Sequence, residues 1–322
     1  MVKELASGAG EFFKKSSVYL ILLFLFVVFS LLAPRFLSVS NLINVLLQTS
    51  IVAMLAIGQT IVMLTAGIDL SVGMVAVFCG AVAAGLVTGY VWGLNLGSLT
   101  VFILTLILGS LLGGVSGALV VFGNLPPFVA TLAMMAIAQG LTLVFTQGKP
   151  IAGLPESFVF LGSGSVLGIP FPIILLFIAG ALAYLLLTRT SFGLHIYAIG
   201  GNKEMARLAG VNVRGVELGA YILSGLTAAL AGLILTGRLA SAQPNVGAEL
   251  NLESIAACVL GGTSLFGGTG NVLKTIVGAL IMGTLANGMN LMGIPSYPQL
   301  VIKGLVFIAA VALDILSSRK KI

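Results

Sequence analysis

Long apolar runs separated by short polar breaks fill almost the whole of this sequence. Most runs approach the roughly 20 residues that a helix needs to cross the hydrocarbon core of a bilayer. Charged residues make up only 7% of the chain, whereas soluble domains have about 25%. This number of charged side chains is too small to cover the surface of a globular protein in water. We therefore expect most of the surface to face lipid. The pattern predicts an all-α, polytopic membrane protein.

The runs predict about ten transmembrane helices, which leave no room for a soluble domain, so residues 1–322 are expected to form a single transmembrane domain. Five glycines within 261–270 follow the short eighth run, and a regular helix does not accommodate them easily. The eighth element is therefore expected to be short or re-entrant. The expected spans are 18–33, 42–66, 72–88, 99–121, 128–145, 169–187, 216–239, 254–265, 272–291 and 300–316.

The distribution of Lys and Arg predicts an orientation. With ten spans, three basic residues (Arg35, Lys149 and Arg238) fall on one side, and Lys303 lies within the last span. Because positive residues collect on the cytoplasmic side, we expect both termini and the loop 189–215 to be cytoplasmic. The net charge of +6 then reflects orientation and not a nucleic-acid partner. The basic residues expected in the cytoplasm are Lys3, Lys14, Lys15, Arg189, Lys203, Arg207, Arg214, Lys274, Arg319, Lys320 and Lys321.

The sequence lacks the usual signatures of catalysis. It has one histidine, His195, and two isolated cysteines, Cys79 and Cys258, which argues against a metal site. The segment 268–275 approaches a phosphate-binding loop, but Leu273 stands where the second glycine is needed. We therefore expect no catalytic residue, no metal and no cofactor in this chain. Such a chain is either passive or energised by a partner.

Within the loop 189–215, the pattern predicts a short helix. Asn202 is a suitable N-cap and Gly210 a suitable C-terminal stop. Met205, Leu208 and Ala209 follow a spacing of i, i+3, i+4, which gives the helix an apolar stripe. Two interpretations remain open at this point: an amphipathic turn that lies at the headgroups, or a knob that inserts into a soluble partner.

Three glycines, Gly109, Gly113 and Gly117, repeat at four-residue spacing in the fourth run. This spacing places them on one helical face, where a neighbouring backbone can approach closely.

Asp69 lies at a break between two runs and has two interpretations. With Ser71 it caps the start of the next helix, or it contacts a substrate or a gate.

The remaining charges near the outer side also have structural interpretations. Lys303 is expected to snorkel towards the headgroups or to donate to Gln299, one turn earlier. Glu249 and Glu253 are expected to offset the charge of Arg238 on the outer side.

Five segments carry a resemblance to a known family: 66–73 (AGIDLSVG), 127–132 (PFVATL), 197–202 (YAIGGN), 238–244 (RLASAQP) and 255–265 (IAACVLGGTSL). They resemble the membrane permeases of ABC sugar importers of the ribose, xylose and galactose type. The resemblance covers nearly the whole chain, and several ordered motifs at compatible spacing make it specific.

The resemblance implies a permease subunit of an ATP-binding cassette importer in the bacterial plasma (inner) membrane. It implies inward movement of a monosaccharide or a similar small polyol by alternating access. The implied partners are cytoplasmic ATPase subunits, which carry ATP and Mg, an extracytoplasmic sugar-binding protein, and a second permease copy or a paralogue. The alternative is a passive or ion-coupled membrane carrier, against which stands the lack of ionisable residues at mid-span.

Three sets of candidate residues follow. In the resembled family the matching loop docks into the ATPase, which assigns coupling to Gly200, Gly201, Asn202, Lys203, Glu204, Met205, Arg207, Leu208 and Gly210. Candidates for the substrate pathway or gate are Asn44, Gln48, Gln59, Asp69, Ser71, Phe128, Asn287 and Asn290; buried amides among them could equally bond helix to helix. Candidates for contact with the binding protein on the outer face are Arg238, Glu249 and Glu253.

Overall fold

The structure is a computed structural model, and it describes residues 18–90 and 93–319. Six of its helices are long and apolar enough to cross a membrane, and three shorter apolar helices accompany them. The prediction of an all-α, polytopic membrane protein is therefore confirmed. Five basic residues used to predict the orientation lie outside the described residues: Lys3, Lys14, Lys15, Lys320 and Lys321.

The first described helix is Val18–Leu32. The following elements are α2 (Val39–Leu64), α3 (Val72–Thr88), α4 (Ser98–Val121), α5 (Pro127–Thr146), α6 (Glu156–Ser163), the antiparallel pair β1 (Ser165–Val166) and β2 (Ile169–Pro170), α7 (Phe171–Arg189), α8 (Ser191–Gly201), α9 (Lys203–Leu208), α10 (Val213–Leu239), α11 (Gly247–Leu260), α12 (Val272–Leu291) and α13 (Ser296–Arg319).

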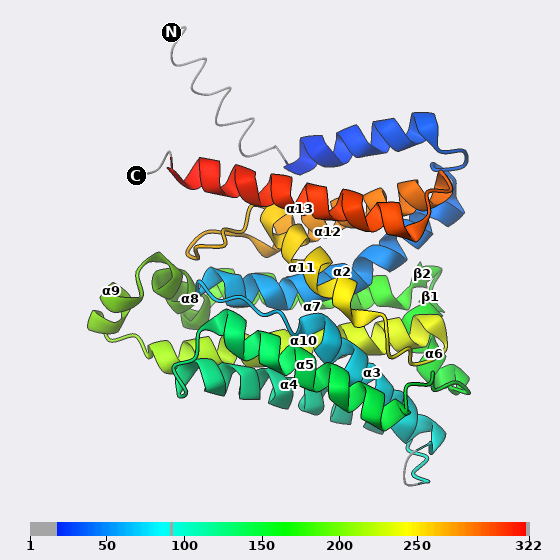
Figure 1. Ribbon diagram of the computed structural model, residues 1–322, viewed down its shortest axis with the longest axis horizontal. Helices are drawn as coiled ribbons and strands as arrows, with labels where there is room; N and C mark the ends of the chain where they lie inside the picture. Colours follow the sequence, from blue (N-terminus) through cyan, green and yellow to red (C-terminus); the bar gives the residue numbers. More distant parts are fainter. Residues whose placement is uncertain (1–17, 91–92, 320–322) are drawn as a thin grey trace, which may run out of the picture.

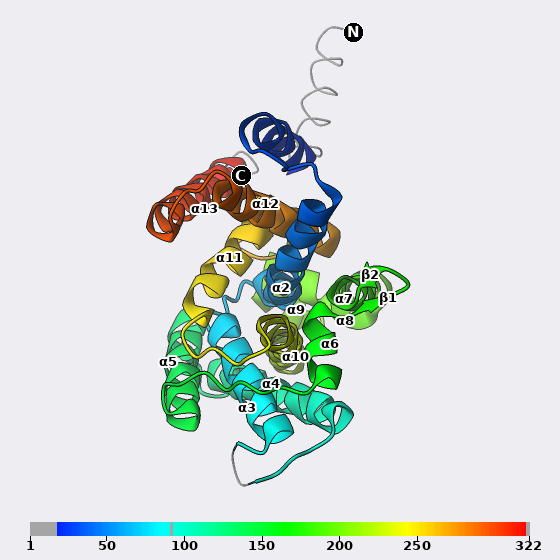
Figure 2. The ribbon, with the colours of Figure 1, turned by 90° about the vertical axis from the view of Figure 1, so that its right-hand side faces the viewer.

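The long helices run back and forth between two ends of the molecule (Figure 1). We call the end with α8 and α9 the α9 end, and the end with α6, β1 and β2 the hairpin end. Viewed along the helices, α2 and α10 lie in the middle of the bundle (Figure 2). In the most apolar 18-residue stretch of α2, 83% of the residues are buried, whereas in the corresponding stretch of α4 only 22% of the residues are buried. The core is therefore built around α2 and α10, and most residues of α4 are not fully buried.

Small residues allow α4 and α10 to pack backbone against backbone. A Cβ at Gly225 of α10 would overlap the carbonyl oxygen of Gly109, and a Cβ at Gly113 would overlap that of Tyr221. A Cβ at Gly117 would lie 2.9 Å from Tyr221 Cβ, which is also too close. The close approach predicted from the glycine spacing is confirmed, and α10 is the helix that approaches.

The eighth expected span differs from the structure in its bounds. It was expected at 254–265, whereas α11 covers Gly247–Leu260 and the loop 261–271 follows it. Glu249 and Glu253 lie in the first two turns of α11, so an apolar pattern does not detect where the helix begins. At the other end the chain turns at Gly262, whose φ of 83° favours glycine. With 14 residues, α11 is short, as expected.

Candidate functional site

The short helix α9 projects from one end of the molecule (Figure 1). The Asn202 side chain accepts a hydrogen bond from the backbone N–H of Met205, with a distance of 2.9 Å, so the predicted N-cap is confirmed. The predicted stop is confirmed as well, because Gly210 has a φ of 85°. Since Met205 is 62% exposed and Leu208 76% exposed, the predicted apolar stripe faces outward. An exposed apolar stripe is what both interpretations of α9 require, a turn at the headgroups and a knob for a partner.

Ion pairs hold α9 to the bundle and to itself. Lys203 Nζ lies 2.7 Å from Glu217 Oε1 on α10, and the Glu217 side chain is only 9% exposed. This pair ties the start of α9 to the first turns of α10. The pair of Arg207 and Glu204, at 2.9 Å, is exposed on both sides and contributes little to stability.

Gly200 lies at a close contact of three backbone segments. The N–H of Gly268 in the loop 261–271 donates to the carbonyl oxygen of Leu64 at the end of α2, with a distance of 3.0 Å. A Cβ at Gly200 would overlap both of these groups, whereas a Cβ at Gly201 would meet nothing within 4 Å. Of these two neighbouring coupling candidates, Gly200 therefore faces the protein's own core and Gly201 faces outward.

A second contact joins α8 to the same loop. The Tyr197 hydroxyl donates to the carbonyl oxygen of Gly270, with a distance of 3.0 Å. Partial burial raises the pKa of Tyr197 above its usual range, so the phenol keeps its proton for this bond. The loop 261–271 thus packs directly behind the α8–α9 segment.

The two neighbouring glycines give a matched test of this contact. We expect Gly200→Ala to lower the free energy of unfolding of the protein by about 1 to 3 kcal/mol, because the new methyl group must displace backbone atoms. Gly201→Ala adds the same methyl group in open space, so we expect a change within about 0.5 kcal/mol. Thermal unfolding in detergent micelles measures both. Equal stability of the two variants would contradict the close contact at Gly200.

Asp69 bonds entirely within the protein. Its Oδ1 accepts from the backbone N–H of Ser71 at 2.9 Å and from the Ser71 hydroxyl at 2.6 Å, and its Oδ2 accepts from the Ser224 hydroxyl at 2.8 Å. With its amide oriented to satisfy both atoms, Gln59 bonds the backbone of Asp69 at 2.9 and 3.3 Å. Asp69 is 2% exposed. This cluster ties the break before α3 to α2 and α10. The capping prediction is wrong in its partners: the Ser71 side chain makes no cap hydrogen bond, and the N–H of Gly73 in the first turn of α3 donates instead to Asn251 Oδ1 on α11.

The other pathway candidates separate in the structure. Asn287 on α12 exchanges two hydrogen bonds of 2.9 Å with Asn41 on α2, so it bonds helix to helix. Asn41 was not among the sequence candidates, although it lies one turn before Asn44. Asn44 is exposed, and Phe128 on α5 is 56% exposed. The structure brings neither of them to the remaining candidates.

Four candidates from two different sets do meet, in a cavity that we call the outer cavity. It has a volume of about 210 Å³ and lies between α2, α10, α11, α12 and α13, close to the hairpin ends of α10 and α12. Gln48 and Asn290 come from the pathway set, and Arg238 and Glu253 come from the outer-face set. Lys303 also lines it, and so does Gln299, which the sequence offered only as a bonding partner of Lys303.

Lys303 pairs with two carboxylates of α11, which corrects the expectation for this region. Its Nζ lies 2.6 Å from Glu253 Oε1 and 3.5 Å from Glu249 Oε2. Gln299 donates instead to Asn290 Oδ1, at 2.8 Å. The predictions that Lys303 snorkels or donates to Gln299 are therefore wrong, and the direct ion-pair partner of the two glutamates is Lys303 and not Arg238. The reason is that α13 packs against α11, so Lys303 faces two acids that are one helical turn apart.

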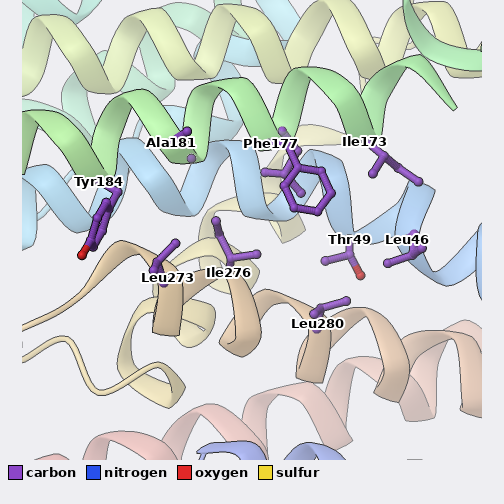
Figure 3. A pocket seen from close by; sticks show the side chains of 11 residues that line it. Leu46, Thr49, Ile173, Phe177, Ala181, Tyr184, Leu273, Ile276 and Leu280 are labelled. Atoms are coloured by element: carbon purple, nitrogen blue, oxygen red, sulfur yellow. The ribbon is translucent and has the colours of Figure 1, made fainter. Parts of the chain in front are cut away.

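A larger cavity of about 360 Å³ lies between α2, α7 and α12. Its lining is hydrocarbon apart from Thr49 and Tyr184, and Figure 3 shows Phe177 and Ile276 among the side chains around it. Such a lining offers few hydrogen bonds to a polar ligand and suits an acyl chain better. We take the outer cavity as the candidate site for a polar ligand, because four of the sequence candidates line it.

Comparison with known proteins identifies the class. Residues 41–311 match the model of the family described as "Branched-chain amino acid transport system / permease component". The chain belongs to this family of transport-system permease components. It is 44% identical over 317 residues to a ribose import permease protein of Haemophilus influenzae, covering 97% of each chain. It is 42% identical to the one of Escherichia coli K12, covering 98% of this chain and 99% of the relative. It is 46% identical to that of Bacillus subtilis, covering 94% and 92%.

These matches confirm the resemblance to the permeases of sugar importers. No solved structure matches the chain significantly. Together with the apolar helices, the matches identify a multi-pass protein of the bacterial plasma membrane that is a permease component and not itself the catalytic part. Among the described residues, no group of three or more His, Cys, Asp or Glu side chains could hold a metal ion.

Proposed function

We propose that this protein is the permease subunit of an ATP-binding cassette importer that moves ribose, or a closely related monosaccharide, inward. The observation that carries the proposal is the 42 to 46% identity to ribose import permeases over nearly the full chain. A D-allose transport permease is 38% identical and a xylose transport permease 34% identical, both from Escherichia coli K12. The family description names amino acids, but these relatives favour a sugar. Nothing in the comparisons favours a passive or ion-coupled carrier.

The proposed topology has ten crossings in a single transmembrane domain, with α11 as the short eighth element. The described basic residues support a cytoplasmic α9 end, because Arg189, Lys203, Arg207, Arg214 and Lys274 lie at helix ends that meet there. This orientation places both termini in the cytoplasm and the hairpin end outside.

The proposed partners follow from this orientation. Cytoplasmic ATPase subunits bind ATP and Mg and dock on α9, with Met205 and Leu208 as the apolar contacts. An extracytoplasmic sugar-binding protein delivers the substrate at the hairpin end, and a second permease copy or a paralogue completes the membrane part. Because Lys203 pairs with Glu217, a displacement of α9 pulls directly on α10. Alternating access requires such rigid-body movements of helices.

Reconstitution tests the proposal. The chain is purified with the ATPase and the sugar-binding protein of the proposed importer and is placed in proteoliposomes. We expect uptake of labelled ribose that requires both partners and ATP. Uptake that persists without the ATPase would support a passive carrier, and uptake of leucine but not of ribose would support the amino-acid branch of the family.

A further inference from the structure

The outer cavity contains polar groups with free bonding capacity. The side chains of Arg238 and Gln48 make no hydrogen bond or ion pair with any other residue that the structure describes. The side-chain oxygen of Asn290 accepts one hydrogen bond from Gln299. The side-chain N–H groups of Asn290 have no hydrogen-bond partner among the residues that the structure describes. A half-buried guanidinium carries five N–H donors, and leaving them without acceptors is costly. These free donors point to a ligand that supplies acceptors.

The charges around the cavity balance. Arg238 and Lys303 are positive, Glu253 and Glu249 are negative, and Lys303 is already paired with both acids. An anionic ligand would upset this balance, since it would add a net charge to a partly desolvated site. The charge arrangement therefore favours a neutral ligand.

The polar groups are spread over several walls of the cavity. Gln48 belongs to α2, Arg238 to α10, Asn290 to α12 and Gln299 to α13. Between them lie the apolar side chains of Ile51, Val52, Leu235, Leu250 and Met282. A ligand with hydroxyl groups on several sides and C–H groups between them matches this lining. An amino acid with a branched side chain has its polar groups at one end and matches it less well.

We propose that the outer cavity is a binding site for a neutral monosaccharide, in which Arg238, Gln48 and Asn290 bond to its hydroxyl oxygens. This inference rests on the proposed importer function and adds a sugar subsite within the membrane part. It also changes the interpretation of Arg238 from a contact for the binding protein to a contact for the sugar.

The test uses the reconstituted complex of permease, ATPase and binding protein. Arg238→Met keeps the apolar stem and removes the donors, so we expect the ribose uptake rate to fall about tenfold, as for the loss of a charge-assisted hydrogen bond. Stimulation of ATP hydrolysis by the loaded binding protein should persist. Gln48→Leu and Asn290→Leu should lower uptake less and should alter the preference among ribose, allose and xylose. Arg238→Lys, which keeps the charge, should retain part of the uptake.

Arg35→Met is the matched control, because Arg35 is exposed in the turn before α2, away from this cavity. We expect it to leave uptake unchanged. Wild-type complex that takes up none of the three sugars would refute the importer function itself. Wild-type uptake with an unaltered Arg238→Met variant would refute the sugar subsite alone. Equal loss of uptake and of stimulated ATP hydrolysis would return Arg238 to the binding-protein interface. Competition by leucine that disappears in Arg238→Met would assign the cavity to an amino acid.

Discussion

Replacing both Met205 and Leu208 by aspartate is expected to reduce ATP-driven uptake by about a hundredfold or more and to release the ATPase subunit from the complex. Both side chains are largely exposed at the tip of α9, so the fold should tolerate the changes. In the docked complex they would be buried. Burial of one such side chain stabilises by about 1.5 to 3 kcal/mol, and every 1.4 kcal/mol lost weakens binding about tenfold. Two aspartates at the same place would add the cost of burying charge.

Co-purification of the ATPase from membranes and uptake into proteoliposomes measure the two effects. Leu167→Asp is the control, because Leu167 is 99% exposed at the opposite, hairpin end of the molecule. This variant should retain the ATPase. If the double variant kept both the ATPase and normal uptake, α9 would not be the coupling helix.

Removing the positive charge of Lys303, which lies between α11 and α13, should greatly lower the free energy of unfolding. Lys303 and Glu253 have side-chain exposures of only 17% and 14%. In Lys303→Met the Glu253 carboxylate loses its partner while it remains largely buried, so we expect a loss of about 3 kcal/mol. Glu249 is 56% exposed and can be solvated by water instead. The double variant Lys303→Met with Glu253→Gln removes both charges and should recover most of the loss.

A double-mutant cycle compares four proteins: the wild type, Lys303→Met, Glu253→Gln and the double variant. Their thermal unfolding gives the coupling free energy between Lys303 and Glu253. Arg207→Met serves as the control, because it breaks an ion pair that is 68% and 71% exposed and should leave the stability unchanged. A double variant as unstable as Lys303→Met would show that the lysine acts by packing and not by its charge.

Local features of the fold could be predicted from the sequence because their causes are local. Asn202 caps the nearest helix, Gly210 provides a left-handed residue after it, and the spacing of Gly109 and Gly113 is a property of one helical face. Each of these depends on residues a few positions apart. The class of fold could be predicted for the same reason, since a long apolar run is itself the requirement for a membrane helix.

Pairings between distant helices could not be predicted in this way. Asn41 and Asn287 are 246 positions apart, and Lys303 is 50 positions from Glu253. Which side chains meet depends on how the helices rotate and cross, and no periodic pattern in one run encodes this. For the same reason, the sequence alone assigned Gln48 to the substrate pathway and Arg238 to the outer face. In the structure the two residues line one cavity.

The helix α2 reaches both proposed functional regions of the protein. Near one end it contributes Gln48 to the outer cavity, and at the other end the carbonyl oxygen of Leu64 holds the loop that packs against Gly200. The 16 residue steps from Gln48 to Leu64 span about 24 Å at 1.5 Å per residue, and the helix contains no proline that could kink it. An unbroken helix transmits an axial push with little compression. We therefore expect α2 to act as a connecting rod, so that the occupancy of the outer cavity and the position of α9 are mechanically linked.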